Sequence, residues 1–156
     1  MRIAPTSEPA SGSDIDIDIL TAPDKSLGIQ WRGMDFEFTQ EQNLLRDSVR
    51  RMMQRLATPD TIRRLDREQA YPYDLYDAWV EMGLLRMPFP EEYEGLGGNP
   101  IDMAVIAEEL SRSSFDFFTA YGGSVFCGLN IVRKGSEDQK RYWIPKLLSG
   151  VVKMSI

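Results

Sequence analysis

The chain of 156 residues contains no histidine and only one cysteine. The absence of histidine excludes Ser–His and Cys–His triads, histidine-based proton transfer and most transition-metal sites within this chain, and we expect no metal site. Cys127 has no partner for an internal disulfide, and its place in the most apolar stretch predicts an inert thiol buried in the core. So low a cysteine content is typical of a reducing compartment, and we expect a cytoplasmic protein.

Positive charge is also scarce, with 18 Lys and Arg against 24 Asp and Glu and a formal net charge of −6 at pH 7. Nucleic acids and anionic membranes bind clustered Lys and Arg, so neither is expected as a partner. The arginines lie among acidic residues on predicted helices, where we expect a solvated or salt-bridged surface: Arg50, Arg51, Arg55, Arg63, Arg64 and Arg67.

No apolar run crosses a bilayer comfortably, since a transmembrane helix needs about 20 apolar residues. The longest uncharged stretch, residues 117–132, reads FFTAYGGSVFCGLNIV and includes three glycines. A helix that is apolar on nearly every side is normally buried at the centre of a helical protein. We therefore predict a buried central helix that ends near Lys134 and Gly135, with small residues that let a neighbouring helix or a ligand approach its backbone.

Residues 1–33 differ in composition from the rest of the chain. Residues 1–24 are rich in Pro, Ser, Asp and Ala without a helical period, which is typical of a disordered segment. Residues 14–19 alternate Asp and Ile as a strand would, but no partner strand is evident, so an extended tail is expected. The acidic residues exclude a mitochondrial transit peptide, and no apolar region of a signal peptide is present. The domain is expected to occupy residues 34–156.

Five further helices are predicted from capping residues and apolar spacing. The first, residues 40–56, begins at a capping box of Thr39 and Gln42, and the second runs from Pro59 to about residue 69. The third starts at residues 71–72, the fourth follows a cap at residues 99–100, and the last follows a capping box at residues 136–139 and bends at Pro145. Side chains at helical spacing are expected to face the core: Leu44, Leu45, Val49, Met52, Met53, Leu56, Ile62, Leu65, Leu75, Trp79, Met82, Ile101, Ala104, Val105 and Leu110.

The remaining features suggest no chemistry of their own. The glycine-rich loop at residues 91–98 is not a GxGxxG motif and does not follow a clear strand, so it only weakly resembles a phosphate-binding loop. Glu108 and Glu109 point about 100° apart on a helix, which favours surface charge or a structural ion pair over an acid–base pair. Residues 153–156 read as the start of a strand, and we expect more chain to follow. From residues alone, the chain is an all-α, up-and-down bundle of about six helices without a complete catalytic constellation.

Several motifs occur in a familiar order. Residues 34–46 open with MDF and TQEQ, residues 79–85 read WVEMGLL, and residues 90–97 read PEEYEGLG. Residues 135–140 read GSEDQK and are followed by Tyr142, Pro145 and Gly150. In this order and spacing, residues 35–156 resemble the N-terminal α-helical domain of the acyl-CoA dehydrogenase family of flavoproteins. One departure is Glu94, which stands where that family usually has a glycine.

The resemblance implies an oxidoreductase that uses FAD to convert an acyl-CoA thioester to trans-2-enoyl-CoA. It also implies an electron-transferring flavoprotein or similar acceptor, and a homodimer or homotetramer when full length. The catalytic glutamate and the flavin loop of the family are expected beyond Ile156, so the chain alone is expected neither to hold FAD nor to be active. The implied substrate-binding residues are Phe118, Thr119, Gly122, Gly123 and Phe126, and the implied cofactor contacts are Met154, Ser155 and Ile156.

Three alternatives remain open at this stage. A flavin monooxygenase or a nitroalkane oxidase of the same superfamily shares this domain, and the third alternative is a non-catalytic helical interaction module. The acyl length is open too, because Phe118 and Phe126 narrow the implied cavity while Gly122 and Gly123 widen it.

Overall fold

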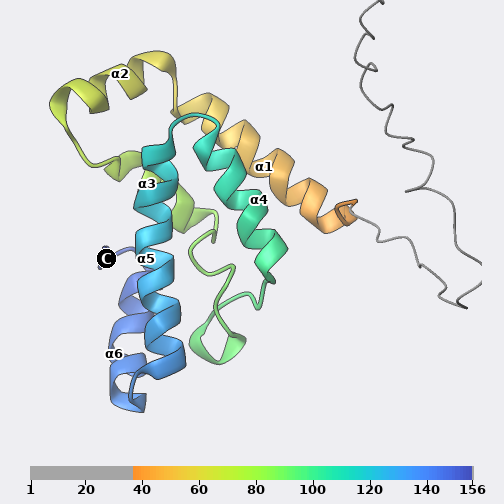
Figure 1. Ribbon diagram of the computed structural model, residues 1–156, viewed down its shortest axis with the longest axis vertical. Coiled ribbons are helices and arrows are strands. Elements are labelled where there is room, and N and C mark those ends of the chain that lie inside the picture. The colour runs from red at the N-terminus through yellow and green to blue at the C-terminus, as the bar shows by residue number, and fades with distance from the viewer. Residues whose placement is uncertain (1–36, 156) are drawn as a thin grey trace, which may run out of the picture. The chain divides into compact units, whose positions relative to one another are not determined.

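The computed structural model describes residues 37–155, so the predicted tail at residues 1–33 and the implied cofactor contact Ile156 lie outside the described residues. Within this part the chain is all-helical and has no strand, which confirms the predicted all-α class (Figure 1). Residues from Phe38 onward form one compact unit. The elements are α1 Gln40–Leu56, α2 Pro59–Glu68, α3 Tyr73–Glu81, the 3-10 turn η2 Glu91–Tyr93, α4 Pro100–Ser111, α5 Phe115–Lys134 and α6 Glu137–Leu148.

Four of the six α-helices in the described residues begin where local capping predicts, namely α1, α2, α4 and α6. A side-chain cap satisfies backbone N–H groups that the first turn of a helix leaves unpaired. Reciprocal capping boxes close the starts of α1, α4 and α6, and a threonine followed by proline starts α2. The residues involved are Thr39 with Gln42, Asn99 with Asp102, Ser136 with Gln139, and Thr58 with Pro59.

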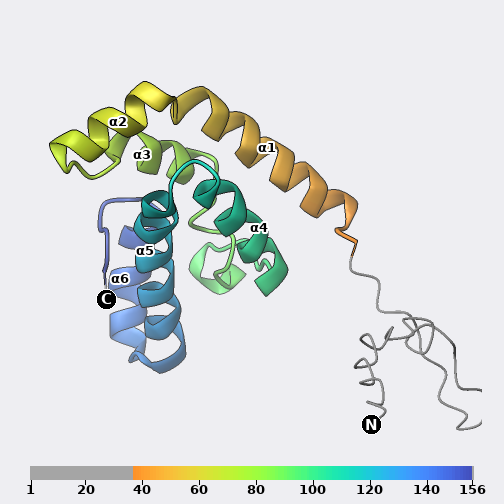
Figure 2. The same ribbon diagram turned by 45° about the horizontal axis from the view of Figure 1, so that its top comes forward.

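Helices α1 and α4 lie side by side and run in the same direction (Figure 1 and Figure 2). The side-chain amide of Gln42 donates to the Asp102 carboxylate at 3.0 Å, which joins the two capping boxes. Two turns further along, Arg50 donates to both carboxylate oxygens of Glu109 at 2.9 and 2.6 Å. The paired residues are 60 and 59 positions apart in the sequence, and this nearly constant offset shows that the two helices are parallel. The hydrogen bond to Glu109 is also the main cause of the raised pKa of Arg50.

Helix α5 packs against both α4 and α6, and the core lies beneath it. Its buried side chains Phe117, Tyr121 and Val125 belong to the same core cluster as Tyr76 and Trp79 of α3. A Cβ atom on Gly128 would lie 2.6 Å from the Phe89 ring and 2.9 Å from the Leu147 side chain. Only a residue without a side chain therefore lets α6 and the segment after α3 reach the helix at this point.

The central helix is buried on one face rather than on every side. Phe115 is 69% exposed and Phe126 is 41% exposed, whereas Phe117 and Val125 are buried. Cys127 is partly exposed, which corrects the prediction of a core thiol. Position 127 lies 200° around the helix from Val125, outside the buried stripe.

Several residues predicted to face the core are exposed instead. Leu44 is 140° around α1 from the fully buried Val49, so it lies outside the stripe that the helix buries. On α4 the apolar residues surround the helix, and spacing alone does not select the inner face: Ile106 is fully buried, while Ile101 is exposed. The exposed residues that were predicted inward are Leu44, Met82, Ile101 and Ala104.

The glycine-rich loop uses its own backbone donors. The N–H groups of Leu96, Gly97 and Gly98 donate to the carbonyls of residues 86, 89 and 87 at 2.7 to 2.9 Å. Groups paired in this way are not available to a phosphate, so the weak resemblance to a phosphate-binding loop fails on geometry. Glu94 in this loop has φ 63° and ψ 21°, the left-handed conformation that a glycine adopts freely.

Replacing Glu94 by glycine should stabilise the domain. The left-handed conformation costs a residue with a Cβ atom about 1 kcal/mol. The exposed contact of Glu94 with Arg86, at 4.0 Å, contributes little in return. Urea unfolding followed by circular dichroism should therefore show a higher midpoint for Glu94→Gly. The matched variant Glu94→Ala keeps the strain and should show no gain. Equal midpoints for the two variants would contradict this account.

Candidate functional site

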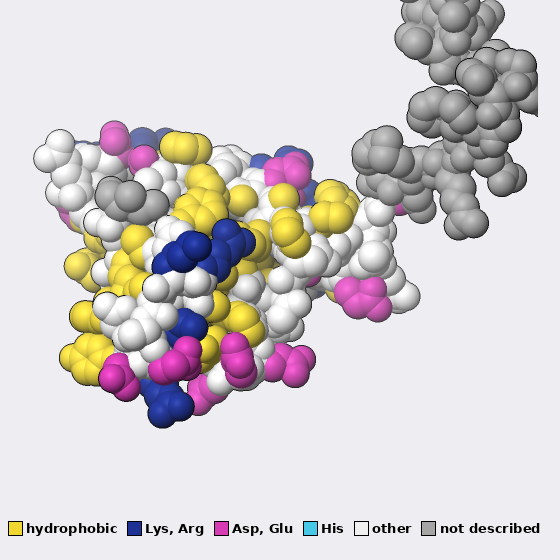
Figure 3. Space-filling model, turned by 60° about the horizontal axis from the view of Figure 1, so that its bottom comes forward, with side chains coloured by type: hydrophobic (Ala, Val, Ile, Leu, Met, Phe, Trp, Pro, Cys, Tyr) yellow, Lys and Arg dark blue, Asp and Glu magenta, His cyan; other side chains and the backbone are white. Residues whose placement is uncertain are grey.

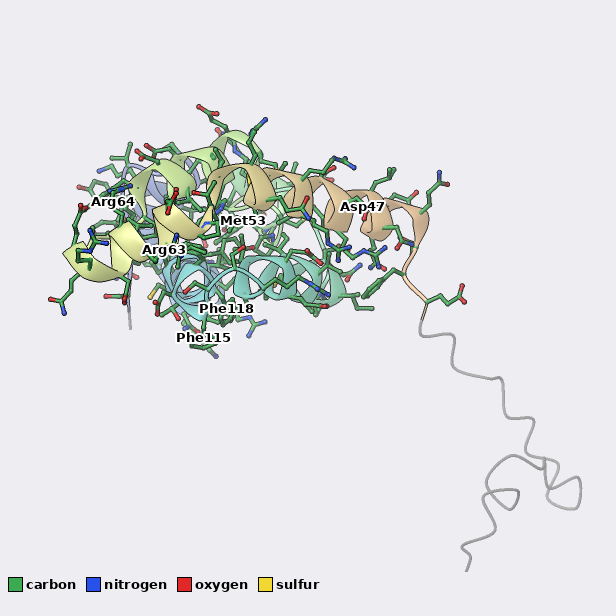
Figure 4. The ribbon with its side chains drawn as sticks, turned by 90° about the horizontal axis from the view of Figure 1, so that it is seen from above. Asp47, Met53, Arg63, Arg64, Phe115 and Phe118 are labelled. Carbon is green, nitrogen blue, oxygen red and sulfur yellow. The ribbon has the colours of Figure 1, made fainter. Side chains whose placement is uncertain are left out.

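The five residues implied in substrate binding share one face of α5. At 100° per residue, positions 118, 119, 122, 123 and 126 fall within an arc of about 140°. We call these five residues the outer face. It lies opposite the buried Phe117 and Tyr121. Figure 4 shows Phe118, together with Phe115, on the side of α5 that points away from α1.

Two phenylalanine rings cover a glycine on the outer face. The ring centroids of Phe118 and Phe126 are 6.4 Å apart, and the rings meet edge to face at 78°. A Cβ atom on Gly122 would lie 3.3 Å from the Phe118 ring and 3.4 Å from the Phe126 ring. The rings therefore lean over the backbone of Gly122, which is buried beneath them. The exposed Phe115 adds a third ring, 5.7 Å from that of Phe118.

The C-terminal segment lies against α5 at the next two residues. The backbone N–H of Met154 donates to the Ser124 hydroxyl at 3.1 Å, and this hydroxyl lies 3.4 Å from the Met154 carbonyl oxygen, to which it donates. A Cβ atom on Gly123 would be 3.1 Å from the same carbonyl oxygen. The segment is extended, but no described strand pairs with it, so the strand predicted from residue 153 does not form within residues 153–155.

A lysine helps to hold this segment in place. The Lys153 ammonium donates to the Gly150 carbonyl at 2.7 Å and lies 4.8 Å above the centre of the buried Tyr76 ring. Cation–π contacts of this kind add to stability where the ring is shielded from water. The end of the described chain, beside α5 in Figure 1, is thus tied to the core by both a hydroxyl and an ammonium group.

An open cleft of about 780 Å³ lies beside the outer face. Its walls come from α2, the link between α2 and α3, the first turns of α5 and the C-terminal segment. Thr119, Met154 and Ser155 line it, so the structure brings three of the implied site residues together here. Phe118, Gly122, Gly123 and Phe126 are not part of the lining.

Sequence reasoning did not identify the α2 side of this cleft. Ile62 and Leu65 were predicted to face the core because of their spacing, yet both also line the cleft. No local signal could have shown this, since it depends on where α2 docks. Apolar side chains form much of the surface, and they are Ile62, Leu65, Ala70, Pro72, Phe117, Ala120 and Met154.

The charged groups of the cleft balance one another. Arg63 and Lys153 are its cations, and Asp66 and Asp116 are its acids. Arg63 is already paired with Asp60 at 2.6 Å, and Lys153 with a backbone carbonyl. Burial, the larger cause, and the neighbouring tyrosines raise the pKa of Tyr71, which keeps this phenol neutral. The cleft thus suits an uncharged, largely apolar group better than a phosphate.

Neither a metal cluster nor a membrane span is found in residues 37–155. No group of three or more His, Cys, Asp or Glu side chains there is placed to hold a metal ion. No helix in that range is both long enough and apolar enough to cross a bilayer.

Comparison with known sequences identifies the family. The profile described as "Acyl-CoA dehydrogenase, N-terminal domain" matches residues 39–151. The chain belongs to the acyl-CoA dehydrogenase family. This confirms the resemblance of the motifs. The family is one of flavin-dependent oxidoreductases, and its matched domain here includes the whole of α5 and α6.

Relatives of this domain are much longer than the chain. It is 31% identical over 118 residues to "Probable acyl-CoA dehydrogenase YngJ" of Bacillus subtilis (strain 168), which covers 75% of the chain and 31% of that protein. It is 35% identical over 119 residues to "Isovaleryl-CoA dehydrogenase, mitochondrial" of Solanum tuberosum, covering 74% of the chain and 28% of that protein. The chain thus spans about a third or less of these curated relatives.

A solved structure has the same arrangement of helices. It is described as "Electron transferring flavoprotein of Acidaminococcus fermentans: Towards a mechanism of flavin-based electron bifurcation". The TM-score is 0.70 at 26% sequence identity, and the match covers 77% of this chain and 32% of that chain. The helical arrangement of the acyl-CoA dehydrogenase domain described here is therefore found in an experimental structure.

Removing the Ser124 hydroxyl should loosen the C-terminal segment. Ser124 is fully buried, and its hydroxyl is the only described partner of the Met154 N–H group. The loss of one such hydrogen bond costs about 1 kcal/mol, so Ser124→Ala should speed hydrogen exchange at the Met154 amide about fivefold. Ser149→Ala, which removes an exposed hydroxyl from α6, serves as the control and should leave this exchange unchanged. Unaltered exchange in Ser124→Ala would contradict the described contact.

Proposed function

We propose that this domain forms one wall of the acyl site in an FAD-dependent acyl-CoA dehydrogenase that produces trans-2-enoyl-CoA. The observation that carries the proposal is the outer face of α5, where the helix that builds the core leaves Phe126 exposed and Phe118 partly exposed. Exposed apolar surface of this kind is normally covered by a ligand or another domain. Figure 3 shows that hydrophobic side chains also reach the surface on the face turned to the reader, among Lys, Arg, Asp and Glu.

The proposed substrate contacts are the five outer-face residues. Phe118 and Phe126 present rings to the acyl chain, and Thr119 joins this face to the adjoining cleft. Gly122 leaves space for the two rings, and Gly123 leaves space for the Met154 carbonyl, so the protein fills the space at both glycines. An apolar wall of this kind excludes water from the Cα–Cβ bond that reacts.

Bound FAD would supply the acceptor for the hydride that leaves the β-carbon of the substrate. The proposed flanking contacts of this chain are Met154, Ser155 and Ile156. The glycine-rich loop and the cleft do not fit the pyrophosphate of FAD, because the amides of this loop and of Met154 are already paired and both cations of the cleft have partners. The pyrophosphate is therefore proposed to be held by residues outside the described part.

The proton-abstracting glutamate is also proposed to lie outside residues 37–155. Glu109 is only 1% exposed and is held by Arg50 at 2.6 Å and Arg112 at 3.3 Å. A carboxylate fixed between two guanidinium groups on the α1 side of α4 is a structural group rather than a base aimed at a substrate. This domain is therefore proposed to shape the site and to exclude water from it, without taking part in proton transfer.

The remaining features of the proposal concern the whole enzyme. Electrons pass to an electron-transferring flavoprotein or a similar acceptor, and the full-length protein is a cytoplasmic homodimer or homotetramer. The family membership supports the electron acceptor and the oligomeric state, and the proposed cytoplasmic location rests on the single cysteine, which agrees with a reducing compartment.

An acyl-CoA should perturb the outer face more than any other surface of the domain. In a titration of the ¹⁵N-labelled chain with octanoyl-CoA, the amide signals of Phe118, Gly122, Gly123 and Phe126 should shift, because the apolar tail seeks apolar surface. Free CoA should not shift them. The exposed Tyr142 and Trp143 on α6 provide an internal control for nonspecific contact. Shifts at this control pair equal to those on the outer face, or no shift on the outer face, would contradict the proposal.

The chain alone should hold no flavin. Purified from cells supplied with riboflavin, the 156-residue chain should lack visible flavin absorbance and should not oxidise butyryl-CoA, since neither the glycine-rich loop nor the cleft leaves donors free for the pyrophosphate. The coding sequence extended to the length of the relatives should yield a yellow protein with activity. Stoichiometric flavin on the short chain would contradict this view. A yellow extended protein that oxidises a nitroalkane or hydroxylates its substrate would assign the domain to the oxidases or monooxygenases, and a colourless extended protein would favour an interaction module.

A further inference from the structure

A series of contacts fixes the path of the chain after α6. The backbone turns at Gly150, which has the left-handed φ of 74°, and the Val152 N–H then donates to a carbonyl of α6 at 3.1 Å. The Lys153 ammonium donates back to the Gly150 carbonyl at 2.7 Å, and the Met154 N–H donates to the Ser124 hydroxyl at 3.1 Å. No strand in the described part pairs with this segment, so these contacts take the place of a sheet ladder.

Lys153 is the only charged residue between positions 149 and 155. Its ammonium lies 4.8 Å from the centre of the Tyr76 ring and 5.5 Å from that of Tyr73. Tyr76 is fully buried and Tyr73 is exposed, so the ammonium lies where the core meets water. A cation above an aromatic ring gains more when it is partly shielded from water, and a charged donor strengthens the hydrogen bond to the carbonyl. Lys153 therefore fastens this segment to the core.

Met154 and Ser155, two of the proposed flavin contacts, follow this lysine directly. Both line the open cleft, where apolar side chains form much of the surface and both cations already have partners. Such a surface fits the uncharged ring system of a flavin better than its phosphates. The place of these two residues beside a bound flavin depends on how firmly the segment before them is held.

We propose that Lys153 is a positioning residue for the flavin, because it holds Met154 and Ser155 where the cofactor meets this domain. The inference rests on the proposed function and adds to it a residue that acts through its neighbours. The ammonium faces a tyrosine ring and the Gly150 carbonyl, so Lys153 itself is not proposed to contact the cofactor.

The first test measures the segment in the 156-residue chain, without any cofactor. Lys153→Met keeps most of the length of the side chain but removes the ammonium. Hydrogen exchange at the Met154 amide should become about tenfold faster, because the charged hydrogen bond and the contact with the ring are both lost. Lys153→Arg keeps a cation above the ring and should stay within about twofold of the unaltered chain. Unchanged exchange in Lys153→Met would overturn the inference.

The second test measures FAD binding in the full-length enzyme that contains this domain. When the apoenzyme is titrated with FAD and flavin fluorescence is followed, Lys153→Met should raise the Kd about tenfold, and Lys153→Arg should restore it to within about twofold. Ser124→Ala loosens the same segment at the next residue and should raise the Kd about fivefold. At saturating FAD, the KM for butyryl-CoA should not change, because the outer face is unaltered. A merely structural role for Lys153 would instead lower the unfolding midpoint and leave the Kd for FAD of the folded enzyme unchanged.

Lys146→Met is the matched control. The Lys146 ammonium lies 3.4 Å from the centre of the Tyr142 ring, so this variant also removes a cation from a tyrosine. Tyr142 is exposed on α6 and is not part of the cleft lining. The control should therefore leave both the exchange at the Met154 amide and the Kd for FAD unchanged.

The possible failures are distinguishable. Faster exchange in Lys153→Met with an unchanged Kd for FAD would overturn the positioning role while the proposed function stands. Normal FAD binding in Ser124→Ala, beside weak binding in Lys153→Met, would also overturn it, because the lysine would then act on the cofactor directly. A full-length protein that binds no flavin or oxidises no acyl-CoA would overturn the proposed function itself, and the inference with it.

Discussion

The close approach of other segments to small residues of α5 is the constraint on which the rest of the structure depends. Gly128 admits the Phe89 ring and Leu147, which brings the segment after α3 and helix α6 onto one side of the helix. Ser124 and Gly123 receive the backbone of Met154, and Gly122 receives two rings of the helix itself. Helix α5 thus builds the core with one face and the candidate site with the other. A larger side chain at any of these positions would displace the segment that packs there.

A second constraint fixes α4, and with it the start of α5. Glu109 is buried and is held by Arg50 from α1 and by Arg112 from its own helix. A buried carboxylate is tolerated because it is paired and hydrogen-bonded at both oxygens. At the other end of the pair of helices, Gln42 completes its own capping box and donates to Asp102 of the next one. The register between α1 and α4 is therefore set at two points by polar contacts rather than by apolar packing alone.

Predictions of helix starts that depend on local capping were confirmed, whereas predictions that depend on tertiary contacts were confirmed only in part. The capping residues Thr39, Asn99 and Ser136 act within three residues of themselves, so the sequence identifies the helix starts directly. Leu44, Ile101 and Cys127 are exposed to different degrees because burial depends on which neighbours a helix meets. For the candidate site, the family resemblance implied five residues, and these share one face of α5. The sequence could not predict the cleft formed with α2, the contact of Ser124 with Met154 or the covering of Gly122, because each depends on how the chain folds.

Three polar groups near the candidate site are already engaged with the protein. Ser124 holds the C-terminal segment, the Tyr121 hydroxyl donates to the Leu84 carbonyl at 3.2 Å, and Lys153 donates to Gly150. A group bound in this way is costly to withdraw, since its former partner is then left unsatisfied in the interior. The outer face of α5 therefore offers apolar rings and a fixed backbone rather than free polar groups, and its shape depends on how the two rings lie above Gly122.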